Sequence, residues 1–92
     1  MTIKLSKEFI IEALVELCST LVDSKITVRH ESGYDKFYHK STLLFKAWIY
    51  DQSGQLDASI TRVHIQTTLL HRLINNFEIN FGKCVTVTLN EL

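Results

Sequence analysis

The hydrophobic positions of this chain follow two different periods, one typical of helices and one typical of strands. Between about residues 6 and 23, apolar side chains recur every three or four positions, as on one side of a helix. Ser6 stands where an N-cap is expected, and Glu8 lies in the first turn, where the helix dipole favours an acidic side chain. Leu5 and Ile10 flank this cap with the spacing of a hydrophobic staple. These features predict a helix from about Ser6 to Asp23.

The apolar side of this helix is wide. Its members are Ile10, Ile11, Ala13, Leu14, Val15, Leu17, Cys18, Leu21 and Val22. They cover well over half of the circumference, more than one sheet face usually covers, so we expect a second packing partner. The polar strip that remains includes Glu8, Glu12 and Glu16, one turn apart. It is either a solvated face or an acidic ridge that meets a basic surface of a partner.

Three segments alternate apolar and polar residues with the period of a strand. They run from about 25 to 31, from 42 to 51 and from 83 to 90. In the second segment one face would consist of Leu43, Phe45, Ala47 and Ile49, and the other of Leu44, Lys46, Trp48 and Tyr50.

Two connections carry turn residues. Ser32 and Gly33 begin a turn after the first strand, and the residues that follow, up to Lys40, can end in a strand. The segment from Asp51 to Gln55 is typical of a hairpin, in which Gly54 supplies a positive φ.

The segment from 56 to 65 fits both periods. Leu56, Ile60 and Val63 have the spacing of a helix, but β-branched residues are frequent here and favour a strand. The hairpin before it also needs an antiparallel partner. We therefore predict a strand to about Ile65 and keep a helix as the alternative.

A second helix is predicted from about Gln66 to Asn80, with Gly82 in the position of a C-cap. The element order is then α-β-β-β-α-β, in a single domain that spans residues 1–92. The simplest way to cover the apolar stripes is a small α+β fold, with a mainly antiparallel four-stranded sheet and both helices on one face. The pattern does not determine which strands lie at the edges.

Charge and cysteine usage narrow the class of protein. Ten Lys and Arg balance ten Asp and Glu, so a nucleic-acid partner would require a local basic patch. The N-terminal apolar stretch is broken by glutamates, and no apolar run reaches the length of a membrane span. Cys18 and Cys84 form no disulfide framework, and we expect both to be small buried side chains in a reducing compartment. These features predict a cytoplasmic protein.

Familiar catalytic and metal-binding motifs are missing. The four histidines lack the spacing of metal ligands, and the chain has no phosphate-binding loop or nucleophile elbow. Cys84 is the candidate for a reactive thiol, because Cys18 lies on the apolar side of its helix. We predict no catalytic residue, no metal ligand and no cofactor.

One segment is rich in both aromatic residues and lysines. Its candidates for binding a partner are Tyr34, Phe37, Tyr38, Lys40, Lys46, Trp48 and Tyr50. If one face of the second strand packs on the helices, Trp48 and Tyr50 lie on the opposite face, where large apolar side chains indicate an interface. The alternative is a strand buried on both faces, with these rings in the core.

These observations predict a small non-catalytic protein-binding module that self-associates, with a homodimer as the simplest form. By analogy of size and lack of motifs, it is typical of regulators or inhibitors of another macromolecular machine, including those of phages and mobile elements. The alternative is a nucleic-acid-binding protein that uses the same aromatic face, with basic residues on that face and acidic ones turned away. The residues concerned are Arg29, Lys36, Lys40 and Lys46, with Glu31 and Asp35 as the acidic ones. A small oligomeric enzyme is the third possibility.

Overall fold

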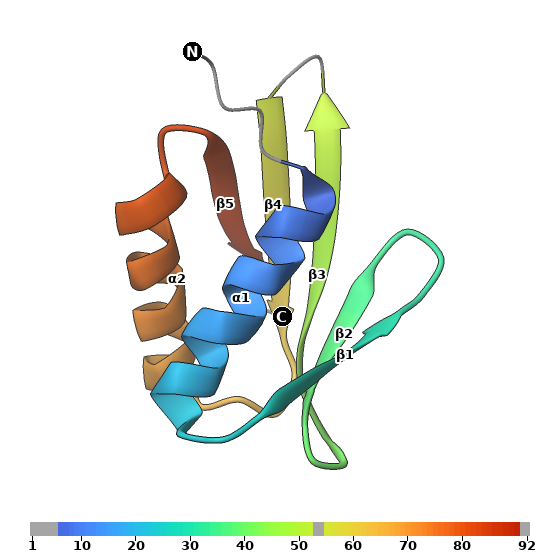
Figure 1. Cartoon of the computed structure of the whole chain (residues 1–92), viewed down its shortest axis with the longest axis vertical. Helices are drawn as coiled ribbons and strands as arrows, with labels where there is room; N and C mark the ends of the chain where they lie inside the picture. The colour runs from blue at the N-terminus through green and yellow to red at the C-terminus, as the bar shows by residue number, and fades with distance from the viewer. Residues whose placement is uncertain (1–5, 53–54, 91–92) are drawn as a thin grey trace.

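Five strands form one sheet, and two helices cover one face of it (Figure 1). The computed structural model describes residues 6–52 and 55–90. In chain order the elements are α1 (Lys7–Val22), β1 (Ile26–His30), β2 (Asp35–His39), β3 (Thr42–Gln52), β4 (Gln55–Arg62), α2 (Thr67–Phe81) and β5 (Val85–Asn90). The predicted α+β fold is confirmed. The order is α-β-β-β-β-α-β, with one strand more than predicted.

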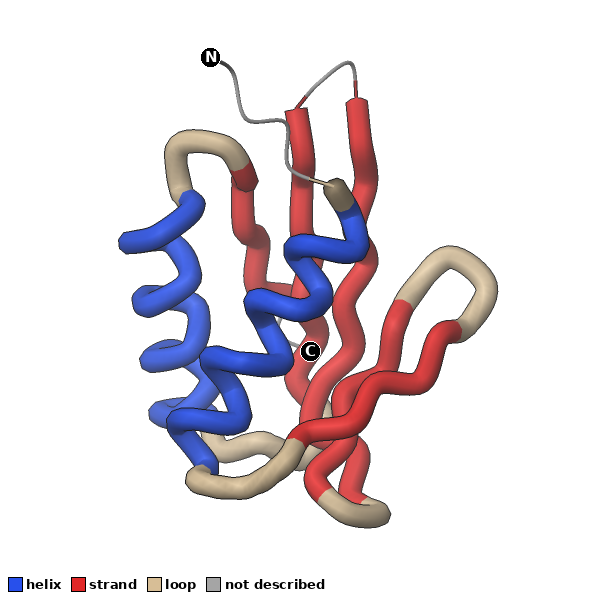
Figure 2. The backbone as a smooth tube through the Cα atoms, viewed as in Figure 1, coloured by secondary structure: helices blue, strands red, loops and turns tan. Residues whose placement is uncertain are grey.

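The strands follow one another across the sheet in the order β1-β2-β3-β4-β5. The first four form an antiparallel meander, in which each strand pairs with the next. β5 pairs with β4 in parallel after the chain crosses over through α2 (Figure 2). A parallel pair needs such a crossover, because a tight hairpin joins only antiparallel strands. The sheet therefore has β1 and β5 as its two edges.

The additional strand is β2, in the segment where the sequence predicted a turn that could end as a strand. Phe37 pairs with Val28 of β1 and with Phe45 of β3, so the strand is held on both sides. Its inward positions include the buried Asp35, a charged residue where alternation leads one to expect an apolar side chain. A charged residue at an inward position interrupts the alternation of apolar and polar residues, so the sequence pattern does not indicate this strand.

The N-terminal helix begins and ends as its sequence predicts. The Ser6 side chain accepts a hydrogen bond from the backbone N–H of Phe9 at 3.1 Å. Asp23 ends α1 in the left-handed conformation, with φ of 52°. The expected second partner is α2, since Phe9 of α1 meets Phe81 of α2 edge to face, with ring centroids 5.5 Å apart. The predicted staple involves Leu5, which lies outside the described residues.

The ambiguous segment is a strand through Arg62, three residues short of the predicted end. The chain then turns beside β3. There the backbone carbonyl of Leu44 accepts hydrogen bonds from the backbone N–H groups of Val63, His64 and Ile65, at 3.0, 3.0 and 3.2 Å. Gln52 pairs with Gln55 and closes the predicted hairpin. The positive φ expected at Gly54 lies outside the described residues.

Gly82 follows α2 as its C-cap, as predicted, but in right-handed conformation with φ of −60°. A Cβ atom at this position would lie 2.5 Å from the carbonyl oxygen of Glu78. Glycine is therefore required here by a close backbone approach and not by a left-handed turn.

The predicted faces of β3 are wrong at Leu43 and Leu44, because its pairing with β2 shifts register between Phe37 and Tyr38. Phe37 pairs with Phe45, whereas Tyr38 pairs with Leu43, so Leu44 has no partner on β2. Leu44 is buried, although the simple alternation predicted it on the face opposite the helices. Leu43 in turn shares the face of its partner Tyr38. A bulge of this kind inserts one residue and changes which side of the sheet the next side chains occupy.

The core lies between the helices and the sheet and includes Cys18, which is buried as predicted. Cys84 is exposed, so the prediction that both cysteines are buried is wrong for this residue. It stands in the turn before β5, where strand alternation does not yet direct the side chain. No helix in the described ranges is long and apolar enough to cross a membrane.

Candidate binding face

The face of the sheet opposite α1 and α2 gathers most of the predicted aromatic and lysine residues; we call it the uncovered face. On β3 its side chains alternate with the buried Phe45, Ala47 and Ile49. The aromatic and lysine members are Tyr34, Lys36, Tyr38, Lys46, Trp48 and Tyr50. On β4 and β5 the same face carries polar side chains, among them the acidic Asp57 opposite Tyr50, so the aromatic part is confined to the β2–β3 half of the sheet.

Two aromatic rings on this face are stacked. The Tyr34 ring lies nearly parallel to the Trp48 indole, with an interplanar angle of 23° and ring centroids 5.1 Å apart. Backbone pairing brings them together, because Asp35 after Tyr34 pairs with Ala47 before Trp48. Each ring covers part of the other, and both are half-buried. Tyr50 stands apart from this pair and is 48% exposed.

Two lysines flank the stacked rings. Lys36 and Lys46 are direct partners on adjacent strands, an arrangement that is unfavourable for like charges. Their Nζ atoms lie 6.0 and 5.8 Å from the centre of the Tyr34 ring. At these distances the electron-rich ring offsets part of the repulsion between the two ammonium groups.

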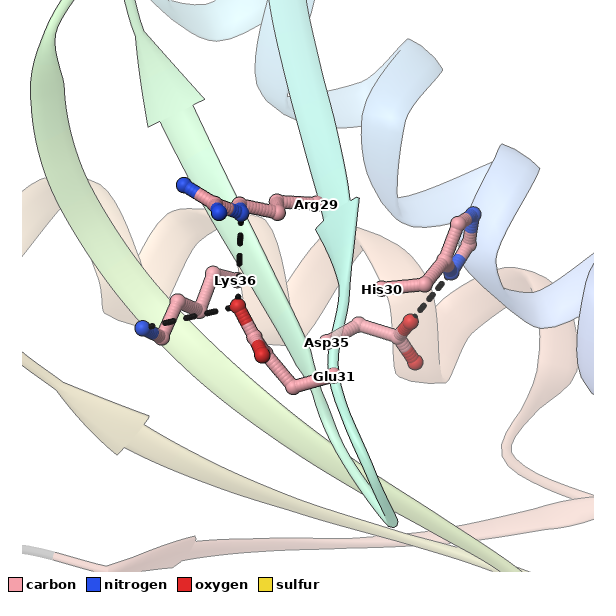
Figure 3. Close-up of polar contacts among 5 residues, drawn as sticks. All are labelled: Arg29, His30, Glu31, Asp35 and Lys36. Atoms are coloured by element: carbon pink, nitrogen blue, oxygen red, sulfur yellow. Dashed lines mark hydrogen bonds and ion pairs between the residues drawn. The ribbon is translucent and has the colours of Figure 1, made fainter.

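The carboxylate of Glu31, on the same face, forms ion pairs with two cations. Glu31 Oε1 lies 3.4 Å from Arg29 Nε and 3.7 Å from Lys36 Nζ (Figure 3). Within the described part of the chain, no carboxylate lies within ion-pair distance of Lys46. Arg29 pairs with Lys36 across the strands, and Lys36 with Lys46, so three cations form one row across β1, β2 and β3.

The second acidic residue of this region points to the helix side. Asp35 is 2% exposed, and its Oδ1 lies 2.5 Å from Nδ1 of His30, whose side chain is 71% exposed (Figure 3). The other oxygen, Oδ2, is buried without a hydrogen-bond partner. A buried carboxylate is costly unless it is paired, so His30 is the group that makes Asp35 tolerable in the core.

The structure separates the predicted partner-binding residues into three groups. Phe37 is fully buried and stacks on Phe45, with centroids 4.5 Å apart, so it offers no surface to a partner. Lys40 is exposed in the turn between β2 and β3 with φ of 57°, away from the row of cations. The remaining predicted residues share the uncovered face. Trp48 is half-buried and Tyr50 exposed, so neither ring belongs to the core.

Arg29 and Glu31 shape the same surface. The nucleic-acid alternative placed Arg29 on this face and required Glu31 to turn away, whereas Glu31 lies beside Arg29 and Lys36. Their role depends on the pairing of β1 with β2, which brings Arg29 next to Lys36. The alternating pattern of β1 places them on that face but does not show which strand is its neighbour.

A shallow hollow lies on the opposite side of the molecule, between the two helices. Its volume is about 220 Å³, and its lining consists of Ala13, Glu16, Leu17, Thr20, Asn80 and Phe81. The exposed glutamates Glu8, Glu12 and Glu16 run along α1 beside it, and Phe9 at its end is 43% exposed. The α1 edge of this hollow therefore carries acidic side chains, whereas the β1–β3 half of the uncovered face carries the row of three cations.

The described residues offer few other candidates for metal binding or for a reactive side chain. No group of three or more His, Cys, Asp or Glu side chains there is arranged to hold a metal ion. Burial raises the pKa of the Cys18 thiol to about 11, which disfavours the reactive thiolate. Comparisons with protein-family models, with curated proteins and with solved structures find no match.

Proposed function

We propose that this protein is a small non-catalytic binding module that docks another protein on the uncovered face of its sheet. The observation that carries the proposal is the Tyr34–Trp48 stack beside the exposed Tyr50, on a face that no described helix covers. Interfaces are enriched in Tyr, Trp and Arg, and ordered rings lose little conformational entropy when a partner binds. A regulator or inhibitor of a larger assembly, acting in a reducing cytoplasm, is the form of this function that we favour.

Nucleic acid is the second candidate, because three cations form a row beside the aromatic rings. Two features favour a protein instead. Glu31 shares the face and already pairs with Arg29 and Lys36, which lowers the net charge available to phosphates. Tyr34 and Trp48 also stack on each other, so each has one ring face fewer for a base.

A capture experiment tests the proposal. Tagged wild-type protein is incubated with lysate, with and without nuclease, beside Tyr50→Ala, Trp48→Ala and the control Asn75→Ala on α2, an exposed residue on the helix side. We expect one protein to be recovered by the wild type and the control, with or without nuclease, and lost from both aromatic variants. A partner that both aromatic variants retain would refute docking on this face, and one that nuclease removes would favour nucleic acid.

A further inference from the structure

The two edges of the sheet differ in how they are protected. An edge strand presents unpaired N–H and C=O groups, and natural proteins discourage pairing there with charges, prolines, bulges or short strands. β1 has only five residues and carries two side chains that can be charged, Arg29 and His30. These features make β1 a poor template for another strand.

β5 has none of these protections. It has six residues, Val85–Asn90, which alternate apolar and polar side chains and include no charge, glycine or proline. Its only neighbour in the described sheet is β4, with which it pairs continuously and without a register shift. The outer row of its backbone groups is therefore open to a further strand.

The side chains of β5 also leave apolar surface uncovered on the helix side. Ala58 and Ile60 of β4 are each 1% exposed, whereas their partners Val87 and Leu89 on β5 are half-buried. The difference arises because β4 has a strand on both sides and β5 on one. An added strand would remove part of this apolar area from water, which favours association.

We propose that two copies of this chain pair through their β5 strands, antiparallel, around a two-fold axis perpendicular to the sheet. Residues directly opposite in an antiparallel pair point to the same side. Two registers satisfy this condition at the middle of β5. In one, Val87 faces its own copy, Val85 faces Leu89 and Thr86 faces Thr88. In the other, Thr88 faces its own copy, Val87 faces Leu89 and Thr86 faces Asn90.

Both registers place apolar residues against apolar ones on the helix side and polar residues against polar ones on the uncovered face. The strand is therefore complementary to itself, as an isologous two-fold interface requires. The resulting ten-stranded sheet would carry all four helices on one side and both uncovered faces on the other. The inference does not depend on the proposed function, but it would present two copies of the Tyr34–Trp48 surface in one direction.

Sedimentation equilibrium tests the dimer. At micromolar concentration we expect twice the chain mass of 10.6 kDa for the wild type. Thr86→Lys/Thr88→Lys changes two exposed side chains and sets introduced lysines opposite each other in either register. It should raise the dimer dissociation constant about tenfold or more, because like charges face each other twice in one register and once at the axis in the other. The matched control Thr27→Lys, exposed on β1, should leave the dimer intact.

Disulfide trapping identifies the register, and it remains informative if the lysine variant fails to fold. In a Cys84→Ser background, Val87→Cys should cross-link two copies under mild oxidation if the axis passes Val87, and Thr88→Cys if it passes Thr88. The Cα separation of opposite residues in a sheet suits a disulfide. Thr27→Cys on β1 should not cross-link.

Three results would overturn the proposal. In the first, the wild type stays monomeric at every concentration. In the second, the two introduced lysines leave the dimer unchanged and neither β5 cysteine cross-links. In the third, the dimer dissociates in Trp48→Ala instead. The last result would place self-association on the uncovered face.

Discussion

The Tyr34 ring lies against the Trp48 indole across the junction of β2 and β3, with ring centroids 5.1 Å apart. Neither ring is in the core, yet each covers part of the other. The contact therefore holds two large side chains in place on a surface that faces away from the helices. A surface of this kind suits recognition, because stacked rings are already ordered before a partner arrives.

Replacing Trp48 should affect binding more than folding. Trp48→Ala removes the ring that supports Tyr34, and we expect a loss of ~2 kcal/mol or more in affinity for the captured partner. The free energy of unfolding should fall less, because the Trp48 ring is half-buried on the surface of the sheet and not in the core. Calorimetric titration and urea unfolding measure the two effects, and Lys40→Ala in the β2–β3 turn is the comparison with a small expected effect. Unchanged affinity and fold in Trp48→Ala would remove the uncovered face as the site.

The lysine pair should separate the two classes of partner. With a protein partner, Lys36→Gln and Lys46→Gln should mainly slow association. With nucleic acid, each should weaken binding and reduce the slope of log affinity against log salt by about one for each lost phosphate contact. Titrations at several salt concentrations measure the slope, with Lys83→Gln as control in the exposed turn before β5. A slope that stays the same in both variants would exclude phosphate contacts by these lysines.

The pair of His30 and Asp35 should matter for stability. His30→Ala leaves both oxygens of a carboxylate that is 2% exposed without a partner. We expect a loss of about 1–3 kcal/mol, the cost of an unsatisfied buried polar group, and the lower part of this range is favoured because His30 itself is mostly exposed. Urea unfolding measures it against His64→Ala, whose ring hydrogen-bonds the Leu43 carbonyl at the surface. Equal losses in the two variants would show that Asp35 does not depend on His30.

The two cysteines should react at different rates. Cys84 is exposed and should be alkylated by iodoacetamide in the native protein, whereas Cys18 should react only on unfolding. Mass spectrometry of timed samples reports one adduct under native conditions and two in denaturant. Cys84→Ser should abolish the native adduct and leave the free energy of unfolding within about 0.5 kcal/mol of the wild type. Fast modification of Cys18 in the native state would contradict its burial.

Stability should fall at high pH through Cys18. Its thiol has a pKa raised from 9.0 to about 11 in the folded protein by burial, so the unfolded chain loses the proton first as the pH rises. The contribution of the protonated Cys18 thiol to the free energy of unfolding is complete below pH 9 and is lost progressively between pH 9 and 11. To isolate the contribution of Cys18, the measurement is the difference in unfolding free energy between wild type and Cys18→Ala at pH 8 and pH 10.5. That difference should shrink at the higher pH, and a constant difference would argue against the raised pKa.

The sequence by itself determined the features that depend on near neighbours. The cap at Ser6, the end of α1 at Asp23, the hairpin closed by Gln52 and Gln55 and the helix before Gly82 follow from short-range spacing and turn chemistry. The alternation along β3 likewise placed Trp48 and Tyr50 on the face away from the helices. These features can be predicted from the sequence, because each depends only on the local period of apolar residues, that of a helix or that of a strand.

Only the tertiary structure decided the features that join distant residues. The β2 strand with its inward Asp35, the register shift that buries Leu44, the exposure of Cys84 and the burial of Phe37 all depart from the simplest pattern. The stack of Tyr34 on Trp48, the sharing of Glu31 by two cations and the position of β5 at an edge depend on which strands become neighbours. That choice is made by the packing of the whole chain, because a strand has the same sequence pattern whichever neighbour it pairs with.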